Sequence, residues 1–454
     1  MKEKLPLSKQ IAYSMGQFGW SLLAGIVSSF LVFYYIPTTE SGIKPSIPQV
    51  TYLGIFTIIG LITMVGRLFD AVTDPWIATL SDRSKSKRGR RISFMRRASI
   101  PFAIFTVLVF CNPIKGESTI NAVILTVTLI LFYLFLTMYV TPYFALLSEL
   151  GHTSEERLNL STYISITWFL GFAVSSQAPM LWNIFVDMGY SKEVSIRIAL
   201  SILAVIGLIF LLIPVIAIDE KRYCESVPSE LKMIDSIKAT FQNKEFRIFV
   251  MSDLVYWIAI TLFQSSLLFY ITVLLDKPEQ MYGILFILLG VGSFIFYVPI
   301  NFIAKKFGKK KLLAFAFAMF IAVYVFGFFL GKLPISTTIQ AYILVIIGSI
   351  PIAIFGILPN VVVADIAEYE AQRTGVRREG MFFGTRTFMS KIGQMISMLL
   401  LSALLLVKRN GSNELGIRLT TVFAAIFCIG GLILLLMYNE DKILNGINNN
   451  NKNH

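Results

Sequence analysis

The sequence predicts an all-α membrane protein with twelve transmembrane helices in two six-helix halves. The first observation is composition: 56% of the 454 residues are hydrophobic and only 15% are charged, with a mean hydropathy of +0.72. A soluble domain has about 45–50% apolar and about 25% charged residues. This chain therefore carries more apolar surface than a soluble fold can bury. The second observation is a series of long apolar runs, and the third is the placement of the basic residues between them.

The apolar runs are each long enough, or nearly so, to cross about 30 Å of hydrocarbon. The third run is the shortest and contains Pro101. In chain order the runs are 11–36, 52–80, 97–114, 118–147, 160–184, 195–218, 246–275, 282–304, 311–332, 338–364, 381–407 and 418–438.

The basic residues orient these runs. The loop between the second and third runs carries eight Lys and Arg residues from Arg83 to Arg97. Two more basic loops, at 305–311 and 373–378, fall on the same side if there are twelve spans, whereas the opposite loops are poor in basic residues. Because Lys and Arg gather on the cytoplasmic side, we expect both termini in the cytoplasm. The net charge of +13 then reflects topology, so the expected partner is the lipid bilayer and not nucleic acid.

The longest polar interruption separates six runs from six. We therefore expect an N-terminal six-helix bundle at 1–218, a cytoplasmic central loop at 219–245 and a C-terminal six-helix bundle at 246–438. The Asn-rich segment 439–454 is expected to be a disordered cytoplasmic tail. Each half has its main basic loop between its second and third runs. Such a repeat is typical of a transporter built from two related halves.

The second apolar run contains three ionisable residues, Arg67, Asp70 and Asp74. Each charge costs on the order of 2.5–3.5 kcal/mol at the centre of a membrane helix, so such groups usually face a cavity or an ion. The two carboxylates lie four residues apart and share one helix face. Carboxylate pairs with nearby hydroxyls suit a cation such as sodium. The alternative is a structural ion network in which Arg67 neutralises one aspartate, and two like charges this close would also suit proton coupling.

Lys391 is the candidate partner charge in the other half. It lies ten residues into the run 381–407, and Asp70 lies ten residues before the end of the run 52–80. At a rise of 1.5 Å per residue, both are about 15 Å from the cytoplasmic boundary. Lys391 is therefore expected to balance the acidic pair when no cation is bound. The alternative is a lysine that extends its amine to the interface.

Four sequence blocks carry a family resemblance. They are GRLFDAVTDPWIATLSDRSKSKRGRR at 66–91, TPYFAL at 141–146, NKEFR at 243–247 and VADIAEY at 363–369. In this order they resemble the glycoside–pentoside–hexuronide:cation symporters of the major facilitator superfamily, the family of the melibiose permease. The resemblance implies the major facilitator fold, an integral protein of a bacterial inner membrane, and coupling to Na⁺ or H⁺.

The resemblance also implies site residues. The family's cation ligands fall on Asp70, Thr73, Asp74 and Thr137, with Asp70 and Asp74 as the carboxylates that would hold sodium. A functionally important lysine falls on Lys391. In this family charged side chains bind the sugar, but the corresponding positions of this sequence are Ser21, Val140 and Ser165. The expected charged contacts to a sugar are therefore missing.

Other side chains are candidates for a substrate cavity, because aromatic rings stack on sugars and polar groups bind hydroxyls. The same residue types are equally common in packing and at membrane interfaces. The candidates are Gln17, Trp20, Ser21, Tyr139, Tyr143, Phe144, Ser165, Trp168, Tyr256 and Gln264.

Charged residues at the cytoplasmic ends of the runs are candidates for a gate that locks one access state. The alternative is topology determination together with anionic-lipid binding, on the order of 1 kcal/mol per basic residue. The candidates are Asp82, Arg83, Arg88, Arg90, Asp365 and Glu368.

The sequence offers no pattern typical of an enzyme. The two histidines, His152 and His454, lie in a loop and at the C-terminus, and the three cysteines have no metal-ligand spacing. No nucleophile–base set or phosphate-binding Gly-rich loop is present. We expect no cofactor beyond the coupling cation.

The leading functional interpretation is a cation-coupled symporter that moves a glycoside or a related small organic solute by alternating access. One alternative keeps the mechanism and changes the cargo to a lysophospholipid or another amphiphile, because the missing sugar contacts and the TPYFAL block also resemble the lysophospholipid symporters of the superfamily. An alternative of another class is a membrane receptor or scaffold without transport. That class does not require ionisable residues such as Asp70 and Lys391 at matched depth.

Overall fold

The computed structural model describes residues 5–38, 41–52, 56–82, 84, 86, 89–151, 154–224, 240–374, 379–407 and 414–452. The regular secondary structure of these residues is helical, apart from the short antiparallel pair of β1 (Thr51–Tyr52) and β2 (Phe56–Thr57). The chain divides into two compact units. The first comprises Met1–Glu230 with Glu279–Ile284, and the second comprises Leu231–Pro278 with Leu285–His454.

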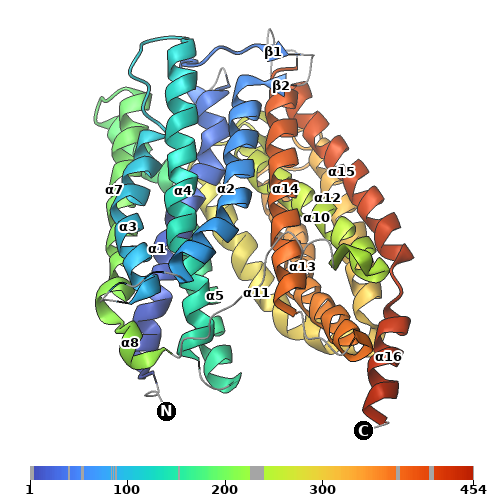
Figure 1. The fold of residues 1–454 in the computed structure, drawn as a ribbon. Coiled ribbons are helices and arrows are strands. Elements are labelled where there is room, and N and C mark those ends of the chain that lie inside the picture. The colour runs from blue at the N-terminus through green and yellow to red at the C-terminus, as the bar shows by residue number, and fades with distance from the viewer. Residues whose placement is uncertain are drawn as a thin grey trace. The chain divides into compact units, whose positions relative to one another are not determined.

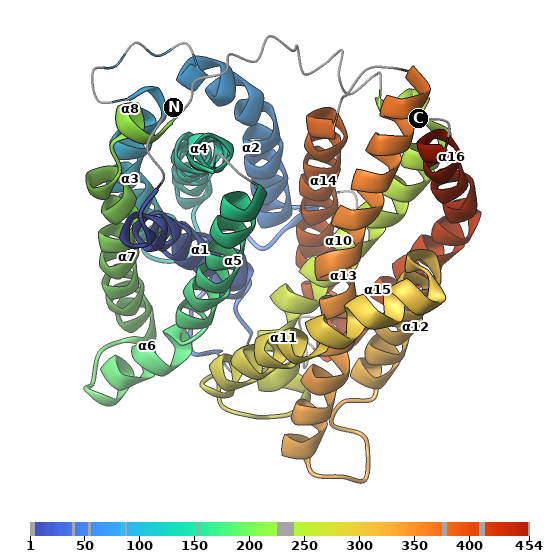
Figure 2. The same cartoon turned by 90° about the horizontal axis from the view of Figure 1, so that it is seen from below.

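The first unit is organised around α1, which contacts α5 and α7, as Figures 1 and 2 show. A second group places α4 against α2 and α3, and α3 also contacts α7. The helices are α1 Leu7–Tyr35, α2 Ile58–Asp82, α3 Arg90–Leu108, α4 Thr119–Leu150, α5 Ser154–Ser175, α6 Ala178–Asp187, α7 Lys192–Ala217 and α8 Glu220–Tyr223.

The second unit is organised around α10, which contacts α14 and α15, while α12 contacts α13 and α15. The α10 helix continues into one π-helical turn, Tyr270–Leu274. The helices are α10 Lys244–Phe269, α11 Met281–Phe307, α12 Lys309–Phe328, α13 Thr337–Thr374, α14 Glu379–Leu405, α15 Glu414–Met437 and α16 Glu440–Lys452.

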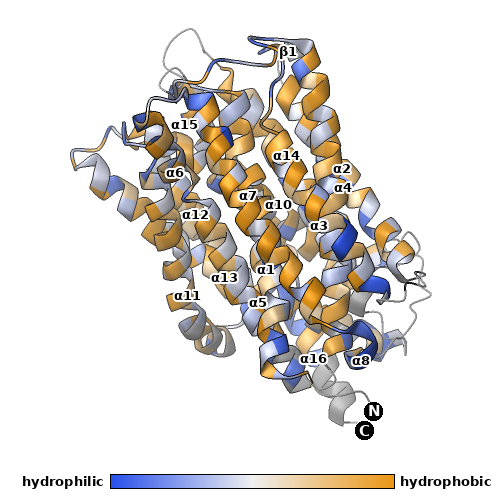
Figure 3. Ribbon diagram, turned by 90° about the vertical axis from the view of Figure 1, so that its left-hand side faces the viewer, coloured by the Kyte–Doolittle hydropathy of each residue, from blue (hydrophilic) through white to orange (hydrophobic). Residues whose placement is uncertain are grey.

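Most of the long helices are apolar enough to cross a membrane. Nine helical segments of the described chain meet this criterion, and Met281–Tyr297 is a shorter apolar helix. Figure 3 shows hydrophobic residues along much of the length of these helices. The α2 helix falls outside the nine and carries the ionisable residues Arg67, Asp70 and Asp74. The predicted all-α class is confirmed, and the number of twelve spans stays a prediction.

A carboxylate binds the N-terminus of the third long helix in each unit. Glu220 accepts hydrogen bonds from three backbone N–H groups at the start of α3, with its oxygens 2.9–3.0 Å from the nearest nitrogens of residues 90–92. Glu440 accepts from the backbone N–H groups of Lys309 and Lys310 at the start of α12, at 2.9 and 3.0 Å. These N–H groups have no partner inside their helix, so a carboxylate there is stabilising.

A glycine with positive φ precedes both helices. Gly89 has φ 106° and Gly308 has φ 87°. A Cβ on Gly89 would lie 2.3 Å from a carboxylate oxygen of Glu220, so the missing side chain lets the carboxylate approach.

The opposite ends of α3 and α12 repeat a second contact. The Arg197 Nε of α7 donates to the carbonyl of Phe110 just after α3, at 3.2 Å. The Arg418 Nη2 of α15 donates to the carbonyl of Leu330 just after α12, at 2.8 Å. A guanidinium thus satisfies the carbonyl end of the helix in both units. The repeat that the basic loops predict extends to the polar contacts within each unit.

The C-terminal segment differs from the predicted disordered tail at 439–454, because the structure places helix α16 there. Glu440 and Asp441 lie in its first turn, where negative charge favours a helix. Ile443 is buried, and the Lys442 amine pairs with Glu245 at 3.1 Å. The Asn-rich composition predicts disorder because it does not reveal these contacts, which involve residues far apart in the sequence. Most of the predicted central loop, 225–239, lies outside the described residues.

Candidate functional site

The α2–α4 interface brings two predicted cation ligands together. Asp70 of α2 and Thr137 of α4 are both buried, each with 1% of its surface exposed. The Thr137 hydroxyl donates a hydrogen bond to Asp70 Oδ1 at 2.8 Å. A buried carboxylate needs such partners, since an unpaired one would cost several kcal/mol. Two residues that the family resemblance assigns to the cation site are thus in direct contact.

A parallel contact lies one helical turn away. The Thr141 hydroxyl of α4 donates to Asp74 Oδ1 at 3.2 Å. Thr141 and Thr137 are four residues apart, as are Asp74 and Asp70, so the two helices present matching rows of oxygen atoms. Pro75 follows in α2, and a proline removes the N–H that would bond the carbonyl of Ala71. Thr141 was not among the predicted cation ligands, although its spacing from Thr137 indicated the same face.

Thr73 contributes a further hydroxyl near the acidic pair. Its Oγ1 donates to the carbonyls of Phe69 and Asp70, at 2.9 and 3.2 Å. Its proton therefore points into its own helix, and the oxygen lone pairs are left to accept or to coordinate.

Arg67 lies on the other side of Asp70. Its Nη1 is 3.9 Å from Asp70 Oδ2, and its guanidinium lies 5.0 Å from the centre of the Tyr133 ring. Its buried Nε has no hydrogen-bond partner among the described residues. The ion network considered as an alternative thus includes the pair of Arg67 with Asp70 Oδ2. Thr137 binds the other carboxylate oxygen, Oδ1, so this ion pair and a cation site are compatible.

Lys391 belongs to the second unit. It is half-buried on α14. Its role as a charge partner of the acidic pair connects residues of different units and stays a prediction.

Four of the cavity candidates lie at exposed or half-buried positions of the first unit, and a fifth, Gln17, is buried beside them. Phe144 and Trp168 are 44% and 38% exposed. The rings of Trp20 and Phe144 meet edge to face, with 6.2 Å between their centres. Gln17, itself buried, accepts a hydrogen bond from the Trp20 indole at 3.0 Å. The exposed residues of this set are Phe144, Ser165 and Trp168, and the half-buried one is Trp20.

Three other candidates are fully buried in helix packing. The Tyr13 and Tyr143 rings stack, and each hydroxyl donates to the backbone carbonyl of the other residue, at 2.6 and 3.0 Å. Tyr139 donates to the carbonyl of Leu211 at 2.9 Å. The Ser21 hydroxyl donates to the carbonyl of Phe18. The Tyr13 and Tyr143 hydroxyls thus join α1 to α4, Tyr139 joins α4 to α7, and the Ser21 hydroxyl is bonded within α1.

The cavity candidates of the second unit are Tyr256 and Gln264. The buried Tyr256 ring stacks on Phe355, with 4.1 Å between centres. Gln264 is half-buried on the same helix, α10.

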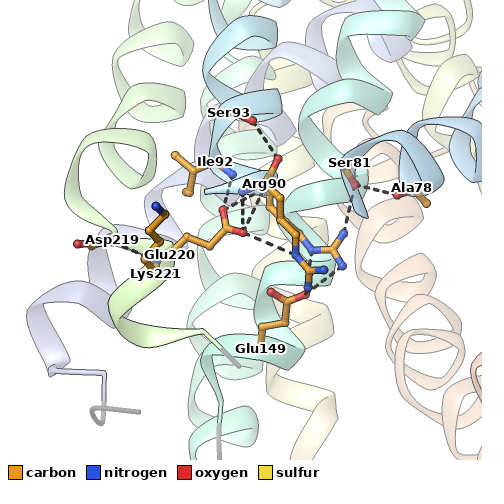
Figure 4. A network of polar contacts seen from close by, with 10 residues as sticks. Ala78, Ser81, Arg90, Ile92, Ser93, Glu149, Asp219, Glu220 and Lys221 are labelled. Atoms are coloured by element: carbon orange, nitrogen blue, oxygen red, sulfur yellow. Dashed lines mark hydrogen bonds and ion pairs between the residues drawn. The ribbon is translucent and has the colours of Figure 1, made fainter. Parts of the chain in front are cut away.

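The gate candidates that the structure describes bind within their own unit. Figure 4 shows Arg90 between two carboxylates: its Nη2 is 2.7 Å from Glu149, and its Nε is 3.9 Å from Glu220. In the second unit, Asp365 pairs with Lys309, and Glu368 accepts a hydrogen bond from Gln372 at 2.9 Å. Arg83, Arg88 and the side chain of Asp82 lie outside the described residues.

Sequence reasoning missed an ion pair in the second unit. Arg386 of α14 binds Asp253 of α10 through two hydrogen bonds, 2.9 and 3.0 Å long. Both residues lie in apolar runs, so the argument that singled out Asp70 also applied to them.

Comparison with known proteins identifies the family. The family model described as MFS/sugar transport protein matches residues 12–442. The chain belongs to this family. This confirms the resemblance drawn from the four sequence blocks.

Relatives of this transporter match over nearly its whole length. The symporter YjmB of Bacillus subtilis, itself uncharacterised, is 26% identical and covers 96% of this chain and 90% of its own. The isoprimeverose transporter of Lactiplantibacillus pentosus is 25% identical, with 97% and 90% covered. The inner membrane symporter YicJ of Escherichia coli is 22% identical, with 86% and 80% covered. The chain is a membrane transporter and not an enzyme.

Solved structures support the fold. The crystal structure of the nucleoside transporter NupG has a TM-score of 0.67 at 11% identity, covering 95% of this chain and 100% of that one. The likeness concerns the fold alone and confirms the all-α transporter architecture.

Proposed function

We propose that this transporter is a cation-coupled symporter that imports a glycoside or a related polyhydroxylated solute across a bacterial inner membrane. The observation that carries the proposal is the buried contact between Thr137 and Asp70. The names of the relatives support it, since they describe symporters and an isoprimeverose transporter. Both termini lie in the cytoplasm in this proposal, because the basic loops are on the same side as the ends.

The cation binds between α2 and α4. Asp70 and Asp74 supply the negative charge, and the hydroxyls of Thr73 and Thr137 supply further oxygen ligands. Sodium fits such a set of hard oxygen donors. A proton is the second candidate, because two carboxylates on one helix face attract one. In the cation-free state, Arg67 and Lys391 balance the acidic pair.

Coupling follows from differential affinity. A cation that neutralises Asp70 and Asp74 takes over the role of Arg67 and Lys391 in balancing these carboxylates. Cation binding thereby increases the population of the state that binds solute. The same free energy works in reverse, so bound solute raises cation affinity by the same factor.

The solute binds against the exposed aromatic face of the first unit. Trp20, Phe144 and Trp168 supply rings for apolar sugar faces, and Gln17 orients Trp20 through its amide oxygen. The lysophospholipid alternative uses the same apolar surface for an acyl chain, so the choice of cargo is an outcome of the experiment.

The experiment is uptake into proteoliposomes with a panel of isoprimeverose, melibiose, glucuronate and lysophosphatidylcholine, under separate sodium and proton gradients. Gradient-driven uptake of a glycoside, abolished in Asp70→Asn and Asp74→Asn, is the expected result. Uptake of lysophosphatidylcholine without any sugar would overturn the glycoside assignment. Equal uptake with and without either gradient would overturn the coupling.

A further inference from the structure

A bidentate ion pair joins α10 and α14 in the second unit. The Nε and Nη2 groups of Arg386 donate to the two oxygens of Asp253, at 2.9 and 3.0 Å. The Asp253 side chain is 1% exposed, whereas that of Arg386 is 13% exposed. The carboxylate is thus sealed inside the unit, and the guanidinium forms the outer part of the pair. This geometry holds the guanidinium plane in one orientation.

The pair lies within the membrane-spanning length of both helices. Asp253 is the tenth residue of α10 and Arg386 is the eighth of α14. At 1.5 Å per residue, they are about 10–14 Å from the helix starts. Replacing a buried ion pair by apolar residues of similar size is often neutral or stabilising, so stability alone does not account for this pair. Charged residues at this depth usually line a water-filled path.

The guanidinium retains hydrogen-bonding capacity. Its Nη1 donates to the Asn360 amide oxygen of α13 at 2.7 Å. Three of its five N–H groups are then used. Among the described residues, no hydrogen bond engages the other two.

Exposed residues near Arg386 on α13 and α14 include small and polar ones. Asn360 of α13 and Gly384 and Thr387 of α14 are exposed. A Cβ added to Gly384 would meet nothing within 4 Å. Exposed amide and hydroxyl groups are unfavourable against lipid tails. These groups of α13 and α14 are therefore better suited to an aqueous path than to a lipid-facing surface.

We propose that Arg386 is a solute-contacting residue of the C-terminal half, and that Asp253 and Asn360 are the residues that position it. The proposal rests on the proposed function and names a charged residue that binds the solute, since the charged sugar contacts expected at Ser21, Val140 and Ser165 are missing. Arg386 donates its two remaining N–H groups to neighbouring oxygens of a polyhydroxylated solute. Because Asp253 neutralises the guanidinium, this contact favours an uncharged glycoside over an anionic one.

The test measures the KM for the best-transported glycoside of the panel in proteoliposomes, together with sodium-dependent thermal stabilisation. Arg386→Lys keeps the charge but loses the planar fork, and it is expected to raise KM about 10- to 100-fold. Sodium-dependent stabilisation measured without solute is expected to stay unchanged. Arg373→Lys is the matched control, because Arg373 is 61% exposed and pairs with Glu370 at the end of α13.

Asn360→Asp provides a second variant that does not endanger folding, since Asn360 is exposed. The new carboxylate competes for the guanidinium, so KM should rise at least tenfold. Unchanged KM in both folded variants, with wild-type uptake intact, overturns this inference and leaves the proposed function standing. A wild-type preference for glucuronate over the neutral sugars overturns the neutral-solute assignment. No uptake of any sugar by the wild type is instead a failure of the proposed function.

Discussion

The hydroxyl of Thr137 donates to the carboxylate of Asp70 across the α2–α4 interface, with 2.8 Å between Oγ1 and Oδ1. The two residues are 67 positions apart in the chain, and both are buried. One helix therefore supplies the charge of the candidate cation site, and the other supplies a neutral oxygen that fixes the orientation of that charge. The charge and the neutral oxygen can therefore be removed separately, by substituting Asp70 or Thr137.

Replacing Thr137 by valine removes the hydroxyl and nearly preserves the shape. Without its hydrogen bond the Asp70 carboxylate loses about 1.5–3 kcal/mol of interaction. We expect the sodium concentration for half-maximal thermal stabilisation to rise about tenfold or more. Thr128→Val is the control, because the Thr128 hydroxyl donates to the backbone of its own helix, α4. Equal sodium affinity in both variants would contradict the role of Thr137.

Gly66 allows the close approach of α2 to Tyr133. A Cβ at this position would lie 2.8 Å from Tyr133 Cε2, so the ring that underlies the Arg67 guanidinium would have to move. We expect Gly66→Ala to destabilise the protein by about 1–3 kcal/mol, as overpacking does, and to lower the apparent melting temperature. Gly430→Ala is the control, since a Cβ there meets nothing within 4 Å. The prediction fails if the two variants melt alike.

Glu220 and Glu440 bind corresponding helix N-termini in the two units. Replacing either carboxylate by the Gln amide removes the charge and one acceptor, and we expect a loss of about 1–2 kcal/mol for each. Because the residues belong to different units, the effects should add in the double variant. Asp219→Asn is the control, since within the described part of the chain Asp219 accepts a hydrogen bond from one exposed backbone N–H, that of Lys221. Melting temperatures in detergent provide the measurement. An unchanged melting temperature in Glu220→Gln would refute the capping role.

Cys224 lies close enough to Glu220 for its thiol to respond to that carboxylate. Burial raises the pKa of its thiol, with smaller contributions from the charges of Glu149 and Glu220. A raised pKa leaves the thiol protonated at neutral pH, and only the thiolate reacts readily. In a Cys111→Ser/Cys428→Ser background we expect slow maleimide labelling at pH 7. Glu220→Gln should accelerate it, because the variant removes a negative charge and loosens the helix cap. If Cys224 in the Cys111→Ser/Cys428→Ser protein reacts with maleimide as fast as a small free thiol in solution, the burial argument is wrong.

The sequence indicated the candidate cation site more completely than the candidate solute site. Asp70 and Asp74 are conspicuous because charges are rare in an apolar run, and the resemblance added Thr137. The role of Thr141 depends on which residues of α4 face α2. The buried Tyr139 and Tyr143 show the limit of residue type as a guide, because a tyrosine that lines a cavity and one that packs against a backbone carbonyl have the same composition signal.

By itself, the sequence determined the helical class, the order of the apolar runs, the basic loops and the presence of costly charges within the runs. These properties depend on residue type and spacing along one segment, and each helix satisfies its own backbone whatever its neighbours are. The tertiary structure decided the partners: Thr137 for Asp70, Arg386 for Asp253, and Glu220 and Glu440 for the starts of α3 and α12. Partner choice depends on how each helix is rotated and shifted against the next. That geometry is set by packing between segments far apart in the chain, of which Gly66 against Tyr133 is one example.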